Sequence, residues 1–148
     1  KLFAGTLRDN LIFGMIGISD EQIIEAAKLT GLIGLINALP NGLDTVVPEG
    51  GESVSGGQKQ LIALTRMIVA NKKIILLDEP TASMDEGTER QIISMLHQKL
   101  SPEQTMVVVT HKPIVLNMVD RIIVLTPNGV AVDGTKEEVL AKLTPKKQ

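Results

Sequence analysis

Apolar residues in the first half of the chain recur three or four positions apart, which is the spacing of one face of a helix. One helix opens at Ser19, because Ser19 and Gln22 have the spacing of a capping box, and it stops near Gly31. Residues 46–54 are rich in Gly and Glu and are expected to form a loop. The helices predicted in residues 1–70 span 9–14, 19–31, 32–39 and 56–70.

The second half of the chain alternates short apolar runs with helical segments. The first two runs are short and continuous, as is typical of strands buried on both faces of a parallel sheet. The turn sequence Pro127-Asn128-Gly129 separates two further runs and predicts a hairpin. The alternation predicts an α/β fold with a parallel sheet. The strands expected are 74–77, 106–109, 122–125 and 130–132, and the helices are 86–100, 113–118 and 136–143.

The composition is that of an ordinary globular domain, with 148 residues, 43% hydrophobic and 22% charged. A net charge of −2, no long basic run and only 1% aromatic residues argue against nucleic acid or an anionic membrane as partner. The absence of Cys excludes disulfides, thiolate zinc sites and a Cys nucleophile. No apolar run approaches the roughly 20 residues that span a bilayer. Because the chain begins at Lys1 rather than Met, we expect it to be a piece of a longer protein.

The first candidate site opens the long helix with Ser55, Gly56, Gly57 and Gln58. Glycines there let backbone N–H groups approach a ligand, and the helix dipole favours an anion such as phosphate. In the alternative interpretation, Ser55 and Gln58 are only a capping box and the glycines belong to the preceding loop. Each glycine costs roughly 1 kcal/mol relative to Ala, which favours a functional reason for keeping two.

The second candidate site is the acid pair Asp78-Glu79, which ends the first apolar strand. Ligands of open α/β sheets bind outside the carboxyl ends of the strands. Asp78 could hold Mg²⁺ on a nucleotide, and Glu79 could orient or deprotonate a water. His111 follows the next strand, so it is expected at the same edge, where it could contact a phosphate and help hold Glu79. The alternatives are an acidic loop start before Pro80 and a structural histidine.

Asp85 has two compatible interpretations, as the cap of the following helix and as a functional residue. Thr88 and Glu89 in the first turn of that helix support the cap. His97 lies in mid-helix beside Gln98 and Lys99 and is expected to be a surface residue.

These pieces occur in an order that resembles the nucleotide-binding domain of ABC transporters, and the similarity runs along nearly the whole chain. The resemblance implies a P-loop NTPase-like (RecA-like) α/β fold. It implies an ABC helical subdomain over residues 1–70 and an incomplete parallel-sheet core over residues 71–148. The matching motifs are the signature at 54–58, Walker B at 74–78 with Glu79 at the catalytic glutamate, the D-loop at 82–85, and His111 at the switch histidine.

Finer similarities indicate an exporter, and more narrowly the type I secretion and bacteriocin-export branch. The exporter-like segments are residues 2–10, 39–45 and 49–51, and those of the narrower branch are 111–113, 120–125 and 133–140. Three features depart from the family. Val54 replaces the usual Leu, Ala82-Ser83 reverses the usual order, and no Gly-x-x-x-x-Gly-Lys-Ser/Thr pattern occurs. In the family that loop, the Q-loop Gln and the adenine-stacking aromatic lie upstream of the residue matching Lys1.

The resemblance implies that two such domains pair head to tail around two ATP molecules. Ser55, Gly56, Gly57 and Gln58 would cap the γ-phosphate of the partner's ATP. Asp78 would position Mg²⁺, Glu79 would activate water, His111 would stabilise the transition state, and Asp85 would link the two sites. The implied partners are a second nucleotide-binding domain and the transmembrane domain of an exporter, contacted through residues 1–70. The implied location is the cytoplasmic face of the cell (inner) membrane.

Without a phosphate-binding loop, the chain alone is expected neither to bind ATP tightly nor to turn it over. A sheet without its neighbouring strand is expected to give a compromised monomer or pairing between chains. One alternative is a non-catalytic fragment that docks on a transmembrane domain. Another is a non-transport ABC ATPase acting on DNA, which the pI near 5.7 and the exporter-like segments disfavour.

Overall fold

The computed structural model describes residues 1–143, so the last five residues of the predicted domain 71–148 lie outside the described part. The chain forms two compact units, which divide between His111 and Lys112. The predicted division at residue 70 separates the helical subdomain from the sheet core of the family, and it stays a prediction.

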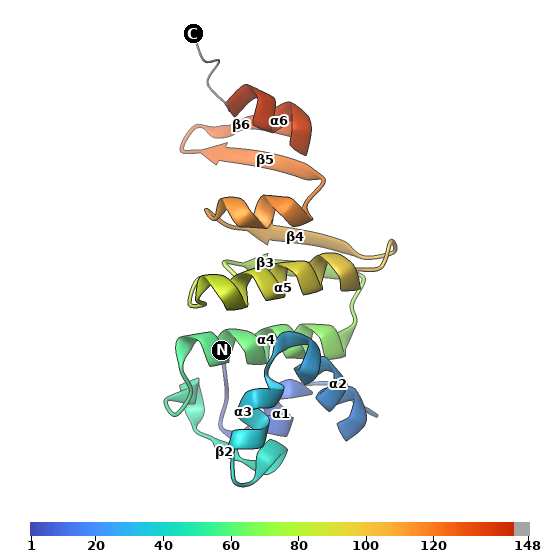
Figure 1. The fold of residues 1–148 in the computed structure, drawn as a ribbon, viewed down its shortest axis with the longest axis vertical. Helices are drawn as coiled ribbons and strands as arrows, with labels where there is room; N and C mark the ends of the chain where they lie inside the picture. The colour runs from blue at the N-terminus through green and yellow to red at the C-terminus, as the bar shows by residue number, and fades with distance from the viewer. Residues whose placement is uncertain (144–148) are drawn as a thin grey trace. The chain divides into compact units, whose positions relative to one another are not determined.

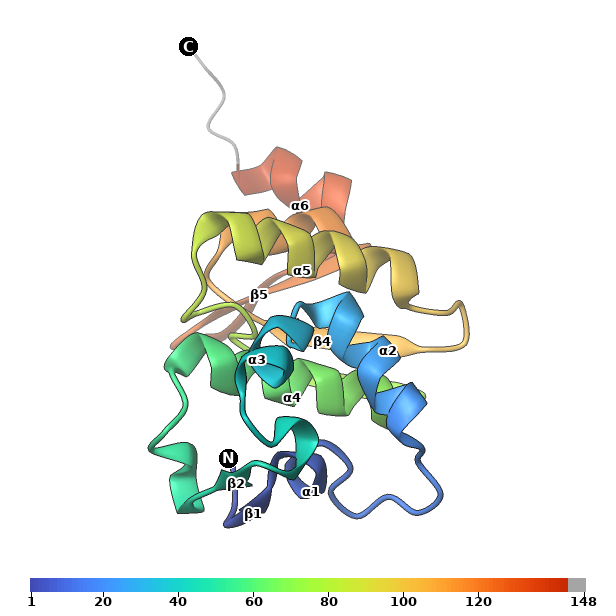
Figure 2. The same ribbon diagram turned by 60° about the horizontal axis from the view of Figure 1, so that its bottom comes forward.

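The four helices predicted in residues 1–70 are present, with small changes in their ends. Ser19 and Gln22 form the predicted capping box. The first helix begins earlier than predicted, because the Thr6 side chain accepts a hydrogen bond from the Asp9 N–H and caps it. Figures 1 and 2 show the first two helices lying beside the fourth. The helices are α1 (Leu7–Leu11), α2 (Asp20–Thr30), α3 (Ile33–Ala38) and α4 (Gly56–Ala70).

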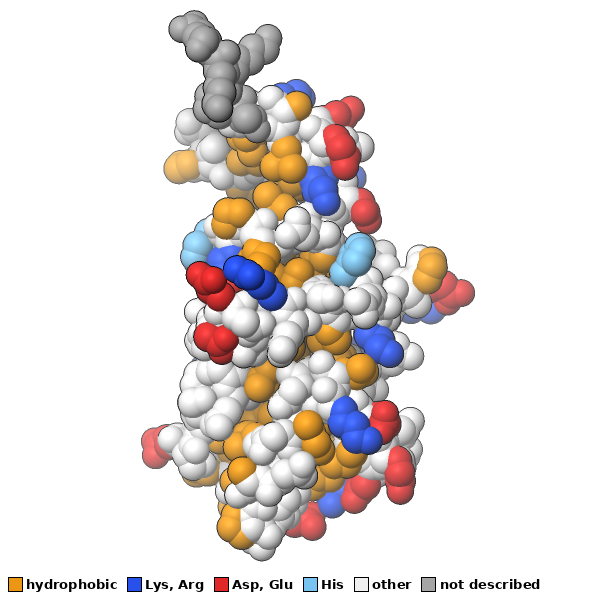
Figure 3. Space-filling model, viewed as in Figure 1, with side chains coloured by type: hydrophobic (Ala, Val, Ile, Leu, Met, Phe, Trp, Pro, Cys, Tyr) orange, Lys and Arg blue, Asp and Glu red, His pale blue; other side chains and the backbone are white. Residues whose placement is uncertain are grey.

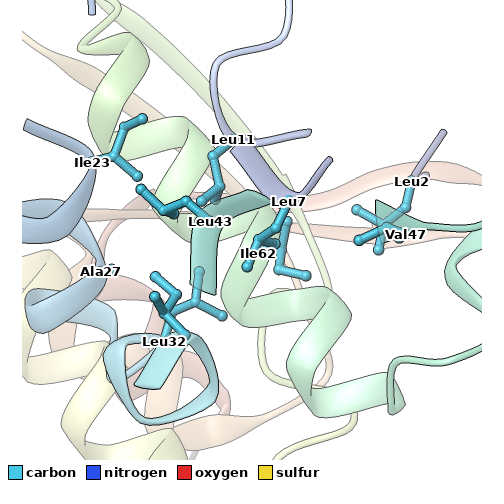
Figure 4. Close-up of a cluster of buried hydrophobic side chains, with 10 residues drawn as sticks. Leu2, Leu7, Leu11, Ile23, Ala27, Leu32, Leu43, Val47 and Ile62 are labelled. Carbon is cyan, nitrogen blue, oxygen red and sulfur yellow. The ribbon is translucent and has the colours of Figure 1, made fainter. Parts of the chain in front are cut away.

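These helices enclose an aliphatic core, as the near absence of aromatic residues requires. Figure 4 shows side chains of α1, α2 and α4 gathered with Leu2, Leu32, Leu43 and Val47. Ile62 of α4 lies among them and is fully buried. The members are Leu2, Leu7, Leu11, Ile23, Ala27, Leu32, Ile36, Leu43, Val47 and Ile62.

The prediction of a plain loop over residues 46–54 was wrong. β2 (Val46–Val47) pairs antiparallel with β1 (Gly5–Thr6), and a 3₁₀ turn spans Glu49–Gly51. The N-terminal backbone supplies the partners, since the Gly50 N–H donates to the Leu2 carbonyl over 3.1 Å. Pairing between such distant segments leaves no local pattern in the sequence.

β3 (Ile74–Asp78) pairs in parallel with β4 (Thr105–Val109), and α5 (Glu86–Lys99) connects them. The parallel sheet and its crossover helix are confirmed. Burial on both faces is wrong, because Ile75 is 5% exposed whereas Leu76 is 75% exposed. Successive side chains of a strand point to opposite faces, and α4 and α5 supply apolar neighbours to one face only. The exposed apolar residues of the other face are Ile74, Leu76, Val107 and Val109.

The second unit contains the predicted hairpin and helices. A 3₁₀ helix (Pro113–Met118) is followed by β5 (Arg121–Thr126), β6 (Gly129–Thr135) and α6 (Lys136–Leu143). β5 and β6 pair antiparallel. An ion pair of 2.6 Å joins Arg121 to Asp133 across the two strands.

Candidate functional site

The structure places Asp78, Glu79 and His111 at the same edge of the parallel sheet, as predicted. Asp78 lies opposite Val109 in the ladder, and the Glu79 N–H donates to the Val109 carbonyl over 2.9 Å. Glu79 Oε1 lies 2.6 Å from His111 Nδ1 and also accepts the His111 backbone N–H over 3.2 Å. Thr110 Oγ1 donates to the second oxygen, Oε2, over 3.3 Å. Thr110 was not predicted to take part.

The hydrogen bond from the His111 side chain is the main reason that the pKa of Glu79 lies below its ordinary value, and it outweighs partial desolvation. Glu79 is therefore ionised at neutral pH. A carboxylate only accepts hydrogen bonds, so His111 Nδ1 must carry the proton that joins them. The imidazole is largely exposed, so its Nε2 remains available. It can accept a hydrogen bond when neutral and donate one to an anion when protonated.

Glu79 also has an unusual backbone conformation for a residue other than glycine, with φ at +43°. Such a conformation costs on the order of 1–3 kcal/mol and persists only where the surroundings hold it. Its carbonyl accepts hydrogen bonds from the Ala82 N–H and from Gln60 Nε2, each 3.2 Å long. Sequence reasoning missed both Gln60 and the strained turn.

The start of α4 confirms the capping interpretation of Ser55 and Gln58. Ser55 Oγ accepts the Gln58 N–H over 3.2 Å, and Gln58 Oε1 accepts the Ser55 N–H over 2.9 Å. Because the cap uses Ser55 Oγ as an acceptor, its hydroxyl hydrogen remains able to donate to a ligand. Capping and ligand binding are therefore compatible here.

Gly56 and Gly57 lie against the turn that contains Ser83. A Cβ on Gly56 would lie 3.2 Å from the Ser83 side chain, and one on Gly57 would lie 3.1 Å from the Ser83 carbonyl oxygen. The glycines therefore have a packing role that the sequence did not reveal. Beside them lies an open hollow of about 420 Å³, lined by Ser55, Gly56, Gly57, Leu61, Ser83, Met84, Asp85 and Thr88.

Asp85 caps α5, as one of its two interpretations required. Its carboxylate accepts the N–H groups of Gly87 and Thr88 over 2.9 and 3.0 Å, and the Thr88 hydroxyl over 2.7 Å. The backbone hydrogen bond from Thr88 is the main reason that the pKa of Asp85 is lowered. Any further role of Asp85 must act through a carboxylate already engaged by its own helix.

The donor set fits Mg²⁺ only together with other ligands. No group of three or more His, Cys, Asp or Glu side chains in residues 1–143 could hold a metal ion. Asp78 is exposed at the sheet edge and offers one carboxylate. Mg²⁺ commonly takes one or two carboxylates and completes its shell with water and phosphate oxygens, so a phosphate-bound Mg²⁺ fits here.

None of the helices in residues 1–143 has the length and apolar character needed to cross a bilayer. On the face of the first unit seen in the lower part of Figure 3, Lys and Arg side chains lie among Asp and Glu. His97 is exposed on α5, as predicted.

Comparisons with known proteins place this chain in a family. A profile described as "ABC transporter" matches residues 3–82. The "Uncharacterized ABC transporter ATP-binding protein YwjA" of Bacillus subtilis is 40% identical over 139 residues, which are 94% of this chain and 24% of that protein. An "ATP-dependent lipid A-core flippase" of Desulfotalea psychrophila is 35% identical over 94% of this chain and 24% of its own length.

A solved structure, "Structure of a bacterial Atm1-family ABC exporter with ATP bound", matches with a TM-score of 0.87 and 32% identity. The match covers 97% of this chain and 25% of that one, and it confirms the predicted P-loop NTPase-like class. This chain thus spans about a quarter of the length of these three proteins. None of the three is described as a type I secretion protein, so the narrower branch stays a prediction.

Proposed function

This chain belongs to the ABC transporter family, and we propose that it is part of an ATP-hydrolysing domain that powers export across a membrane. The observation that carries the proposal is the Glu79–His111 pair, held beside Asp78 at the carboxyl edge of β3 and β4. An ionised acid next to a second carboxylate and an exposed imidazole can orient a water against a phosphoryl group.

Each residue of this edge has a separate part in the proposed reaction. Asp78 would hold Mg²⁺ together with water and phosphate oxygens, and the ion would neutralise charge on the phosphates. Glu79 would accept a hydrogen bond from the attacking water. Its low pKa suits the orientation of water rather than early proton removal, which the loose transition state of phosphoryl transfer does not require. His111 keeps Glu79 in place through Nδ1 and would present Nε2 to the phosphate.

The helix start at Ser55 would act on a different ATP molecule. Gly56 and Gly57 expose the first turn of α4, where the helix dipole favours an anion, and the Ser55 hydroxyl can donate. We propose that Ser55, Gly56, Gly57 and Gln58 cap the γ-phosphate of ATP held by a second, head-to-tail domain. Asp85, which lines the same hollow, would lie close to both sites.

The proposed partners are that second nucleotide-binding domain and a transmembrane domain, contacted through residues 1–70 at the cytoplasmic face of the cell (inner) membrane. The type I secretion and bacteriocin-export branch is the narrower proposal, supported by residues 111–113, 120–125 and 133–140. A non-catalytic module that only docks on a transmembrane domain is the second candidate, and ATP hydrolysis separates it from the first.

Joining the chain to a phosphate-binding half tests the proposal. The upstream half of the ATP-binding domain of the 40% identical Bacillus subtilis relative would be fused before Lys1. We expect steady-state ATP hydrolysis from the fusion and only background from the chain alone. Glu79→Gln should abolish turnover in the fusion while Mg-ATP binding persists.

The matched control is His97→Gln, which changes the exposed histidine of α5 and should leave the rate unchanged. Turnover in the fusion that survives Glu79→Gln would contradict the proposed arrangement. So would turnover by the unfused chain that Glu79→Gln abolishes. A fusion that binds Mg-ATP but never hydrolyses it would support the docking fragment instead.

A further inference from the structure

Gln60 of α4 joins two segments that the proposed reaction needs. Its Nε2 donates to the Glu79 carbonyl over 3.2 Å, and its Oε1 accepts the Ser83 N–H over 3.0 Å. Both ends of one amide are therefore used, and they fasten the two ends of the turn that runs from Glu79 to Ser83. A primary amide is suited to this bridge because it offers a donor and an acceptor on the same short group.

The bridge lies on the same side of α4 as the glycines. Residues three and four apart share a helix face, so Gly56, Gly57 and Gln60 all face the Glu79–Ser83 turn. The glycines allow close approach of Ser83, and Gln60 fixes its backbone. This face of α4 therefore sets the position of the turn in two independent ways.

Further along α4, hydrogen bonds join this helix to α1 and α2. The Thr65 and Thr30 hydroxyls lie 2.7 Å apart and join α4 to α2 in the interior. Arg66 Nε donates to the Asn10 carbonyl of α1 over 2.6 Å. A displacement of α1 or α2 thus reaches α4, and through Gln60 it reaches the backbone of Glu79.

The strained backbone of Glu79 depends on its hydrogen bond from Gln60. A residue other than glycine keeps a left-handed conformation only where its neighbours hold it there. Gln60 is one of the two donors to the Glu79 carbonyl. The direction of the Glu79 side chain toward His111 depends on this backbone. Loss of the Gln60 donor would let the turn relax and carry the carboxylate away from the imidazole.

We propose that Gln60 is a positioning residue that couples the signature end of α4 to Glu79 and the Ser83–Asp85 segment of the same chain. Its catalytic consequence rests on the proposed function. A shift of α4 on contact with a partner's ATP would then move the water-orienting carboxylate of this chain's own site. Gln60 acts through Glu79 and has no contact with substrate in this scheme.

The tautomer of His111 reports the position of Glu79 directly. At a pH about 2 units above the ordinary imidazole pKa, ¹⁵N shifts of the ring show which nitrogen carries the proton. The chain has His97 and His111 as its histidines, so His97 serves as an internal reference. In the ¹⁵N-labelled chain we expect His111 to be held with its proton on Nδ1.

Two variants separate positioning from simple stability. Gln60→Met keeps the volume and removes both hydrogen bonds, whereas Gln60→Glu keeps an acceptor for the Ser83 N–H and removes the donor to Glu79. We expect Gln60→Met to lose the Nδ1–H signal of His111 and Gln60→Glu to lose part of it, with His97 unchanged. Gln98→Met on α5 is the matched control, since Gln98 bonds the Ser94 hydroxyl of its own helix, and should leave His111 unchanged.

A folded Gln60→Met chain with an intact His111 signal would overturn the proposal, even if its unfolding midpoint fell. Should Gln60→Met fail to fold, an intact signal in Gln60→Glu would overturn it equally. The spectra are recorded without nucleotide, so they test Gln60 alone. Glu79-independent turnover in the fusion would instead refute the proposed function and leave the positioning role standing.

Discussion

The packing role of Gly57 leads to a stability prediction with a control inside the same molecule. Gly57 and Gly34 are both the second residue of a helix, in α4 and α3. A Cβ on Gly34 would meet nothing within 4 Å, whereas one on Gly57 would lie 3.1 Å from the Ser83 carbonyl oxygen. The contact with Ser83 is therefore the steric difference between Ala substitutions at the two positions.

The expected sizes follow from helix propensity and from that contact. Ala is favoured over Gly by up to about 1 kcal/mol in a helix, so Gly34→Ala should stabilise the chain by about that amount or less. The same gain is available at Gly57, but the Ser83 carbonyl belongs to a backbone that the Gln60 amide holds and cannot rotate aside. We expect this contact to cancel the gain, so that Gly57→Ala is less stable than Gly34→Ala by the gain that Gly34→Ala keeps, about 1 kcal/mol.

Urea unfolding followed by circular dichroism measures both variants on one scale. In thermal unfolding the difference corresponds to roughly 2–4 °C for a chain near this size. Equal stabilisation by Gly34→Ala and Gly57→Ala would refute the reasoning, because it would show that the turn at Ser83 yields freely to a side chain on α4.

Two further predictions concern the acid pair and the core. His111→Ala removes the main cause of the low pKa of Glu79, so that pKa should rise toward the ordinary value of a glutamate, measured by ¹³C NMR of the carboxyl. A depressed carboxyl pKa adds stability that is lost as the pH falls through the pKa of the folded state. Below about pH 4, the free energy of unfolding should therefore fall more steeply with pH in the unsubstituted chain than in His111→Ala. Equal slopes in the two proteins would contradict this. Ile62→Ala should cost about 2–5 kcal/mol in urea unfolding, since Ile62 is fully buried, whereas Val46→Ala at a 72% exposed position should change stability by less than about 0.5 kcal/mol.

Local chemistry made α4 and the sheet edge predictable. Ser55 and Gln58 are a capping box that fixes where the helix begins, and Asn71 ends it in a left-handed conformation. Asp78 and His111 could be placed together because parallel strands end at a common edge. These features depend on residues adjacent in sequence or on a general rule of topology.

The features that escaped prediction depend on contacts between distant segments. The Gln60 bridge and the approach of Ser83 to Gly57 join residues that no spacing rule connects. The left-handed backbone of Glu79 was hidden because glycine is the usual signal for that conformation. The exposed face of β3 and β4 was also missed, because a continuous apolar run does not show how many faces its neighbours cover.

The central claim is that Ser55 and Glu79 of one chain serve two different ATP molecules, and subunit complementation tests it most directly. Two fusions that carry the phosphate-binding half would be prepared, one with Ser55→Arg and one with Glu79→Gln, and each alone should be inactive. Mixed in equal amounts, they should regain up to about a quarter of the unsubstituted rate, because a head-to-tail pair then contains one intact site. A mixture that stays as inactive as its components, while the two fusions demonstrably pair, would contradict the account.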